Sequence, residues 1–414
     1  MLTQLAAGRL TRHSRRNANL VRNRGRRHSA VGAIRGAGVG WRDPFLSRFG
    51  PGGFAGITLG RWLGILREIG FAIDRPYWGR AAVVTAGSVP NTLLAWVERV
   101  AYARRVRRAE VAPPLFVLGA WRSGTTHLHN LLAQDGRFAF PNTYQVYYPA
   151  TFLLTERASR GFVEFFMPPT RPQDNMAIGG GLPQEDEFAV CALTGLSPMM
   201  EWVAPRRAAH YDRYLTLRDA APGEVTAWKA ALSRFIRKLS FKYGGRPLVL
   251  KSPAHTGRIR LLLELFPDAR FVHIRRNPYD VFRSMMHLLR TAAPYWALQR
   301  PDFGGAAGRA IRWYRAVYDA FFADRGLIPA GRYCEIDFEA LEADPVGQLR
   351  DVYEALGLPD FKAVEPALAR YAASLVGYQK NKLPELTPDE RSRVEREWGR
   401  CFEEWGYPTR QERH

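Results

Sequence analysis

The sequence predicts an α/β protein in which helices flank a central parallel β-sheet and a helical extension precedes the sheet. The apolar run 248–250 is followed by apolar residues at helical spacing over 259–266 and by a second apolar run at 271–274, which predicts a strand, a helix and a strand. A unit of this kind makes its two strands parallel. The chain has 414 residues, 46% of them hydrophobic, and can therefore bury a sizeable core around such a sheet.

The first 50 residues are expected to form a basic, disordered tail. Residues 1–48 contain eleven arginines, no lysine and one acid, Asp43, so they carry +10 of the net charge of +21. They lack the apolar centre of a secretory signal and show no sustained periodicity. The arginines suit nucleic acid or an anionic membrane, but a solvated extension without a partner explains them equally well, and nothing predicts recognition of a specific nucleic acid.

Residues 51–112 are expected to form a helical cap ahead of a catalytic domain at 113–414. The cap contains one apolar stripe at helical spacing, made by Leu59, Trp62, Leu63 and Leu66. Residues 81–97 are uncharged, but they fall short of the ~20 residues of a spanning helix, and Pro90-Asn91 interrupts them near the middle. We therefore expect packed or interfacial helices, with the cap and the tail as the parts that could touch a membrane surface.

The cysteines indicate a reducing compartment. The chain has three, Cys191, Cys334 and Cys401, which are far apart and lack the spacing of a disulfide framework or of a zinc site. A cytoplasmic protein is therefore expected.

A phosphate-binding loop is predicted where the first strand of the catalytic domain ends. The loop, here named the cradle, is residues 119–126 (GAWRSGTT) and leads into a helical pattern. Gly119 and Gly124 match the loop G-x-x-x-x-G-K-[ST], but Thr125 stands where that loop has its lysine, and the cation comes earlier, at Arg122. This predicts a P-loop-like fold whose ligand is not a nucleoside triphosphate.

Cations follow three of the predicted strands. Arg122 comes after the first, Lys251 after the second, and Arg275 and Arg276 after the third. The carboxyl ends of parallel strands meet at one edge of a sheet, which is where ligands of such sheets bind. The sequence therefore predicts an anion site at this edge.

The chain resembles the sulfotransferases that use 3′-phosphoadenosine-5′-phosphosulfate (PAPS). The resemblance covers residues 113–405 and rests on residues 121–126 (WRSGTT) and 271–284 (FVHIRRNPYDVFRS). The cradle is most similar to the branch that contains the tyrosylprotein and many bacterial sulfotransferases. The resemblance implies an enzyme that moves a sulfuryl group from PAPS to a hydroxyl or amine without a metal. Its acceptor stays open between a lipid-like small molecule and an anionic carbohydrate.

The same resemblance implies the residues that hold the donor. The 5′-phosphosulfate would bind the backbone amides and hydroxyls of the cradle, from Arg122, Ser123, Gly124, Thr125 and Thr126. Arg276 and Ser284 would bind the 3′-phosphate. Arg275 is the alternative to Arg276, although strand alternation points it to the other face of the sheet.

Two further features match the family. Lys251 corresponds to a lysine that contacts the bridging oxygen of the leaving phosphate, so it is a candidate catalytic residue together with Arg122. Lys380 and Asn381 stand where the family has a mobile basic loop that closes over the nucleotide.

The general base for an acceptor hydroxyl is open at this point. The tyrosylprotein branch has a glutamate shortly after the cradle, but residues 140–145 contain no acid. The candidates are Glu185 and Glu187 at a predicted helix start, with His255 as a rival, and helix capping explains the two acids equally well. They point about 160° apart on a helix, so one of them at most faces the site, and Glu187 is preferred.

Two other classes of protein compete with this interpretation. A P-loop nucleotide kinase or NTPase would need the missing cradle lysine. A non-catalytic protein that binds anions or membrane surfaces would explain the net charge but not cations at the ends of three strands.

Overall fold

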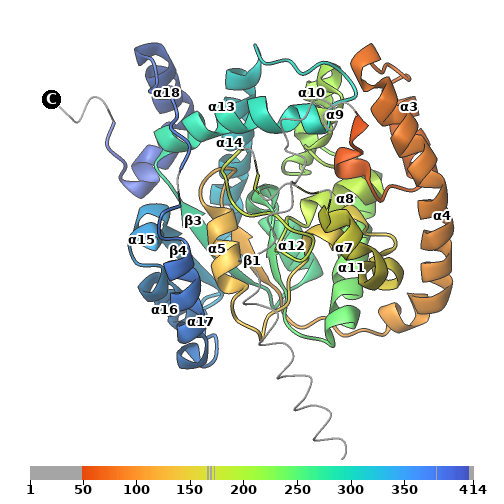
Figure 1. Cartoon of the computed structure of the whole chain (residues 1–414). Coiled ribbons are helices and arrows are strands. Elements are labelled where there is room, and N and C mark those ends of the chain that lie inside the picture. Colours follow the sequence, from red (N-terminus) through yellow and green to blue (C-terminus); the bar gives the residue numbers. More distant parts are fainter. Residues whose placement is uncertain (1–48, 166, 168–169, 172, 379, 410–414) are drawn as a thin grey trace, which may run out of the picture. The chain divides into compact units, whose positions relative to one another are not determined.

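Four parallel strands form the centre of the fold in the computed structural model, which describes residues 49–165, 167, 170–171, 173–378 and 380–409 (Figure 1). The strands are β1 (Leu115–Leu118), β2 (Val249–Lys251), β3 (Arg270–Arg275) and β4 (Tyr333–Asp337), in the order β2-β1-β3-β4. This sheet confirms the predicted α/β class, and the predicted tail lies almost wholly outside the described residues.

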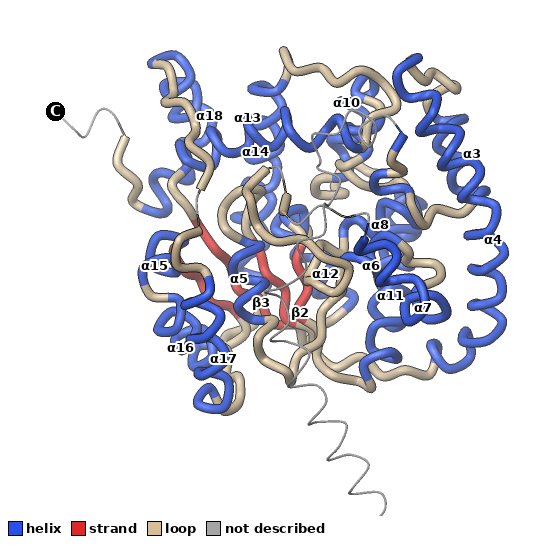
Figure 2. The backbone as a smooth tube through the Cα atoms, viewed as in Figure 1, coloured by secondary structure: helices blue, strands red, loops and turns tan. Residues whose placement is uncertain are grey.

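The helices of the described residues surround this sheet (Figure 2). The α-helices are α3 (Leu59–Glu68), α4 (Trp78–Arg107), α5 (Thr125–Leu132), α6 (Thr143–Tyr147), α7 (Phe152–Phe165), α8 (Glu187–Thr194), α9 (Met200–Val203), α10 (Ala208–Tyr211), α11 (Pro222–Tyr243), α12 (Ile259–Leu265), α13 (Pro278–Ala292), α14 (Ala306–Asp324), α15 (Phe338–Ala343), α16 (Pro345–Ala355), α17 (Phe361–Ser374) and α18 (Pro388–Trp405). A capping box at Thr387 opens α18, where Thr387 Oγ1 accepts from the Glu390 amide.

Strand alternation sorts the two faces of the sheet into two apolar clusters. Leu115 and Val117 of β1 pack with the helices α5, α15, α16 and α17. Phe116 and Leu118 point the other way, into the larger cluster that includes α8, α11, α12, α14 and α18. The central strand β1 is thus buried on both sides, as expected of a parallel sheet.

The strand register brings the predicted cations to one edge. Val117 of β1 lies opposite Lys251 of β2 and opposite Val272 of β3. The cradle leaves β1 one residue later, between two strands that both end in a basic residue. The carboxyl edge of the sheet is therefore where the predicted donor residues can meet.

The cap does not break at Pro90, contrary to the prediction that Pro90-Asn91 interrupts the uncharged stretch. α4 is one helix of 30 residues with Pro90 inside it. Proline removes one backbone hydrogen bond from a helix, at a cost of about 3 kcal/mol. Next to Pro90, Asn91 Nδ2 donates to the carbonyl oxygen of Ala55 at 2.9 Å and so ties the helix to the preceding segment. Among the described residues, no helix has the length and apolar character needed to cross a membrane.

Candidate active site

Three residues of the cradle, two of them glycines, have positive φ values. Gly119 and Gly124 have φ values of 141° and 97°, and Arg122 has a φ of 73°. A Cβ atom at Gly124 would lie 2.2 Å from the ring of Phe338, and one at Gly119 would lie 2.6 Å from Ser123 Oγ. Since α5 begins at Thr125, the loop delivers the first amides of a helix to the carboxyl edge of the sheet, and such amides bind anions.

The side chain of Arg122 joins the cradle to two distant segments. Its Nε donates to Ser284 Oγ at 2.8 Å, and its Nη1 lies 2.7 Å from Asp174 Oδ2. The carbonyl oxygen of Arg122 accepts from Arg276 Nη1 at 2.9 Å. Arg122 of the first motif and Arg276 and Ser284 of the second are therefore neighbours.

The two adjacent arginines after β3 have different surroundings. Arg275 Nε lies 2.6 Å from Asp337 Oδ1, so it pairs with the neighbouring strand. Arg276 lies over the ring of Phe338 at 4.2 Å, and its Nε is buried with no hydrogen-bond partner among the described residues. Burial lowers the pKa of Arg276. The expected alternation is present, and of these two side chains Arg276 is the one beside the cradle.

Lys251 forms a buried pair with Glu185. Its Nζ lies 2.6 Å from Glu185 Oε1 and 3.3 Å from Thr126 Oγ1. Glu185 Oε2 is buried and has no hydrogen-bond partner in the described part of the chain. Burial lowers the pKa of Lys251, although the charge of Glu185 opposes this effect.

The other candidate bases lie in the core. Glu187 is fully buried and pairs with Arg258, Nη1 to Oε2 at 2.6 Å. His255 is also fully buried, and its Nε2 lies 2.6 Å from Asp186 Oδ2. Of the three consecutive acids, Glu185 alone lines the pocket described next. Glu187, the acid preferred from the sequence, therefore lies outside this pocket, whereas Glu185, which precedes the first turn of α8, lines it.

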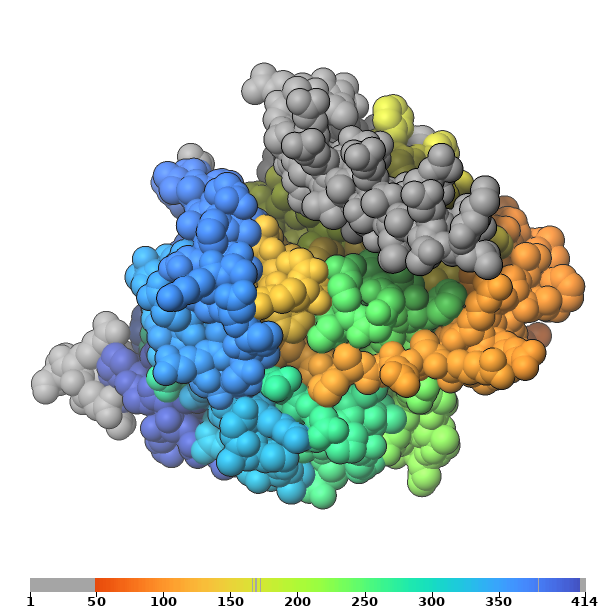
Figure 3. Space-filling model, turned by 90° about the horizontal axis from the view of Figure 1, so that it is seen from below, coloured from red at the N-terminus to blue at the C-terminus, as the bar shows by residue number. Residues whose placement is uncertain are grey.

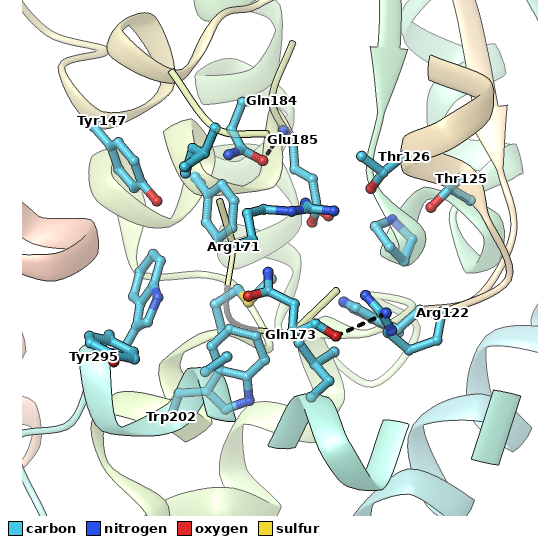
Figure 4. A pocket seen from close by; sticks show the side chains of 18 residues that line it. Arg122, Thr125, Thr126, Tyr147, Arg171, Gln173, Gln184, Glu185, Trp202 and Tyr295 are labelled. Atoms are coloured by element: carbon cyan, nitrogen blue, oxygen red, sulfur yellow. Dashed lines mark hydrogen bonds between the residues drawn. The ribbon is translucent and has the colours of Figure 1, made fainter. Parts of the chain in front are cut away.

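One pocket joins the cradle to a group of aromatic side chains (Figure 4). It contains about 770 Å³ of space, counting the solvent in its open mouth. Its lining residues are Trp121, Arg122, Thr125, Thr126, Tyr147, Arg171, Gln173, Ile178, Gln184, Glu185, Phe188, Met199, Trp202, Pro253, Leu288, Ala292, Tyr295 and Trp296. Figure 4 shows Arg122, Thr125 and Thr126 on one side and Tyr147, Trp202 and Tyr295 on the other.

Arg171 and Asp174 are neighbours of the site that sequence reasoning missed. Asp174 Oδ2 lies 2.7 Å from Arg122 Nη1 and 2.6 Å from Arg171 Nη2, so this carboxylate sits between two guanidinium groups. Burial alone would raise the pKa of Asp174, but the charges of Arg171 and Arg122 outweigh burial and lower it. In the sequence, Arg171 and Asp174 look like any surface pair three residues apart.

The predicted closing loop lies beside this network but outside the pocket lining. Lys380 Nζ is 2.5 Å from Glu342 Oε1, so its charge is paired at the surface. Asn381 Nδ2 donates to the Gln173 carbonyl oxygen at 3.2 Å, and Asn381 Oδ1 accepts from Asn175 at 2.8 Å. Asn381 therefore connects the loop to the segment that carries Arg171 and Asp174.

Comparison with known proteins identifies the class. Residues 113–362 match the model of the sulfotransferase family. The chain is 37% identical over 355 residues to omega-hydroxy-beta-dihydromenaquinone-9 sulfotransferase Stf3 of Mycobacterium bovis and of Mycobacterium tuberculosis, covering 86% of this chain and 91% of each relative. The chain belongs to the sulfotransferase family. It is a sulfotransferase, which sets aside the kinase and the non-catalytic alternatives.

Solved structures agree with the fold. Sulfotransferase STF1 from Mycobacterium tuberculosis H37Rv is similar with a TM-score of 0.59 at 20% identity, over 82% of this chain and 91% of that one. Sulfotransferase STF9 from Mycobacterium avium has a TM-score of 0.60 at 19% identity, over 85% of this chain and 98% of that one. The P-loop-like α/β fold predicted from the cradle is confirmed.

Proposed function

We propose that this sulfotransferase transfers the sulfuryl group of PAPS to a hydroxyl group of a lipid-like acceptor. The observation that carries the proposal is the position of the Lys251–Glu185 pair. Glu185 lines the same pocket as the cradle threonines and the aromatic side chains, and Lys251 contacts both Glu185 and Thr126. One chemical group can thus be held at the cradle while another enters from the aromatic side.

The described residues fit PAPS as the donor. Its 5′-phosphosulfate would accept hydrogen bonds from the cradle amides of Gly124, Thr125 and Thr126, at the start of α5. Its 3′-phosphate would lie at Arg276 and Ser284. In support, Arg276 Nε is buried and lacks a hydrogen-bond partner among the described residues, which favours an anion there.

PAPS, when bound, supplies an activated sulfuryl group and a phosphate leaving group. In the transfer, an S–O bond to the acceptor forms as the bond to the leaving phosphate oxygen breaks. The ammonium of Lys251 and the guanidinium of Arg122 would neutralise the charge that develops on that oxygen. Glu185 Oε2 would take the proton of the acceptor hydroxyl, since it lacks another partner in the described part of the chain.

The acceptor class is proposed from the aromatic side of the pocket. Phe188 and Trp296 stack there at 5.2 Å between ring centroids, and both line the pocket with Tyr147 and Trp202. These rings favour an apolar body over a charged sugar. The relative Stf3 is named for a menaquinone derivative that carries an omega-hydroxyl, which is an acceptor of this kind.

The proposal assigns the enzyme to the cytoplasm, in contact with a membrane that supplies the acceptor. The three cysteines Cys191, Cys334 and Cys401 are free thiols, which is consistent with a reducing compartment.

A thermal-shift experiment tests the donor. We expect adenosine 3′,5′-bisphosphate, the product nucleotide of PAPS, to raise the melting temperature of the protein, because a ligand that binds only the folded state stabilises it. ATP with magnesium serves as the control nucleotide. Stabilisation by ATP alone would contradict PAPS as the donor.

A transfer assay tests the acceptor. We expect radiolabelled sulfate to pass from PAPS to a long-chain isoprenoid alcohol dispersed in detergent, with no transfer to the same molecule capped as its methyl ether. A sulfated disaccharide with free hydroxyls is the competing acceptor. Transfer only to the disaccharide would contradict the lipid-like class while leaving the donor proposal intact.

A further inference from the structure

Helix α4 buries several polar residues and exposes several large apolar ones. Of its seven buried residues, four are polar: Arg80, Ser88, Asn91 and Glu98. Each has a hydrogen bond, for example from Arg80 Nη1 to the Ala297 carbonyl oxygen at 2.6 Å and from the Leu154 amide to Glu98 Oε2 at 3.0 Å. The Ser88 bond stays within α4, whereas Arg80, Asn91 and Glu98 bind other segments of the fold, and Glu98 also pairs with Lys238.

The outer face of α4 is apolar and exposed. It consists of Val83, Val89, Leu93, Trp96, Val97 and Val100. At about 100° per residue these side chains fall within an arc of roughly 140°, opposite the buried stripe. Leu93, Trp96 and Val100 are 64%, 67% and 69% exposed. Figures 1 and 3 show α4, in orange, along the outer edge of the described unit.

This arrangement is the reverse of the usual one. The helices of a water-soluble domain normally turn their apolar stripe to the core and their polar residues to solvent. An outward apolar face contributes nothing to folding in water, and large exposed apolar patches mark interaction sites. The outer face of α4 is therefore expected to bind an apolar partner.

The charges next to this face indicate what the partner is. Residues 99–108 contain five arginines and no acid. Arg104, Arg107 and Arg108 are exposed, and helical spacing places them on the same side of α4 as Leu93 and Trp96. An apolar face with tryptophan and a cluster of arginines at one end matches the surface of a bilayer with anionic headgroups.

We propose that the outer face of α4 binds the surface of a membrane that contains anionic lipids, with the helix lying in the plane of the interface. This inference concerns a surface outside the pocket and does not rest on the proposed acceptor. The two are linked through the segment before α3: Asn91, on the inner face of α4, donates to the Ala55 carbonyl oxygen. The ring centroid of the neighbouring Phe54 lies 6.0 Å from that of Trp296, which lines the pocket. A membrane at α4 would thus be close to the aromatic side of the pocket.

Flotation of the full-length protein with vesicles tests the proposal. We expect binding to vesicles of phosphatidylcholine and phosphatidylglycerol, and weaker binding to phosphatidylcholine alone. The double variant Leu93→Ser/Trp96→Ser should lower the partition coefficient about tenfold or more, because both side chains would leave the bilayer. An Arg104→Gln/Arg107→Gln/Arg108→Gln variant should reduce binding to the anionic vesicles only.

Leu327→Ser/Phe303→Ser is the matched control, since both residues are exposed apolar side chains outside α4, each 44% exposed. It should bind as the wild type does. Retained melting temperature and retained response to adenosine 3′,5′-bisphosphate would show that each variant is folded. Wild-type binding by the Leu93→Ser/Trp96→Ser protein would overturn the proposal, since the basic tail alone would then account for binding. A lipid-free wild-type dimer that this variant converts to a monomer would overturn it in favour of a second copy of the chain.

Discussion

The cradle side and the aromatic side of the pocket differ in how their residues come together. The cradle side is built from the ends of adjacent parallel strands, so Arg122, Lys251 and Arg276 converge through the sheet itself. The aromatic side is assembled from Tyr147, Phe188, Trp202 and Trp296, which come from separate short segments. The cradle side suits a charged group of defined shape. The residues of the aromatic side can differ between enzymes that use different acceptors. Single substitutions should therefore separate donor binding, chemistry and acceptor binding.

The largest effect is expected at Lys251. Lys251→Ala should lower turnover by about two orders of magnitude or more, because it removes a preorganised charge beside the leaving oxygen. Adenosine 3′,5′-bisphosphate should still bind, as measured by calorimetry. Lys229→Ala is the matched control, since Lys229 pairs with Glu264 at the surface. Near-normal turnover of Lys251→Ala would exclude a catalytic role for this lysine.

Two glutamates only two residues apart should respond differently. Glu185→Gln should lower kcat about a hundredfold, as expected when a general base is lost. Glu187→Gln should instead lower the free energy of unfolding by about 3 kcal/mol, because Arg258 would keep a buried charge without its partner. Steady-state kinetics and urea unfolding distinguish the two. Full activity of Glu185→Gln would exclude Glu185 as the general base and leave Glu187 and His255 as the candidates.

The neighbouring arginines after β3 offer a matched pair. Arg276→Ala should weaken the binding of adenosine 3′,5′-bisphosphate about tenfold to a hundredfold, the usual loss for a hydrogen bond to a charged group. Arg275→Ala should leave this affinity unchanged, since Arg275 pairs with Asp337 on the other side. Isothermal titration calorimetry measures both. Equal losses of affinity in the two variants would mean that Arg276 does not bind the 3′-phosphate specifically.

The aromatic side should affect the acceptor alone. Phe188→Ala should raise the KM for a lipid-like alcohol about tenfold, because it removes apolar contact area, and should not change the affinity for adenosine 3′,5′-bisphosphate. Phe303→Ala, at an exposed phenylalanine that does not line this pocket, is the control. A change in nucleotide affinity but not in acceptor KM would show that the two sides are assigned the wrong way round.

The smallest effect is expected in the pH profile. Burial lowers the pKa of Lys251 from its ordinary value of 10.5, and the charged form is the one that would stabilise the leaving oxygen. Activity should therefore be present at lower pH and decline as the pH rises through the lowered pKa. The alkaline limb of kcat/KM should have its midpoint below 10.5 and should be absent from a Lys251→Arg variant that retains activity, since arginine stays protonated. An identical limb in both proteins would assign the titration to another group.

Much of the fold and of the donor side could be predicted because their signals are local. Gly119 and Gly124 mark a backbone that other residues cannot adopt, and the apolar runs of the strands set which residues reach the carboxyl edge. Which of the acids at 185–187 faces the pocket could not be predicted. Glu185 and Glu187 look equivalent in the sequence, and only their partners, Lys251 and Arg258, distinguish them.

The sequence by itself determined the class of fold, the sulfotransferase resemblance and the cations of the donor side, since each follows from short-range spacing or from the geometry common to parallel sheets. The tertiary structure decided which acid meets Lys251, how Asp174 joins Arg122 to Arg171, and which side of α4 faces outward. An uncharged run such as 81–97 indicates that a helix is apolar, but it does not indicate which face of the helix packs against the rest of the protein. That depends on long-range partners, because burial is a property of the whole packed chain.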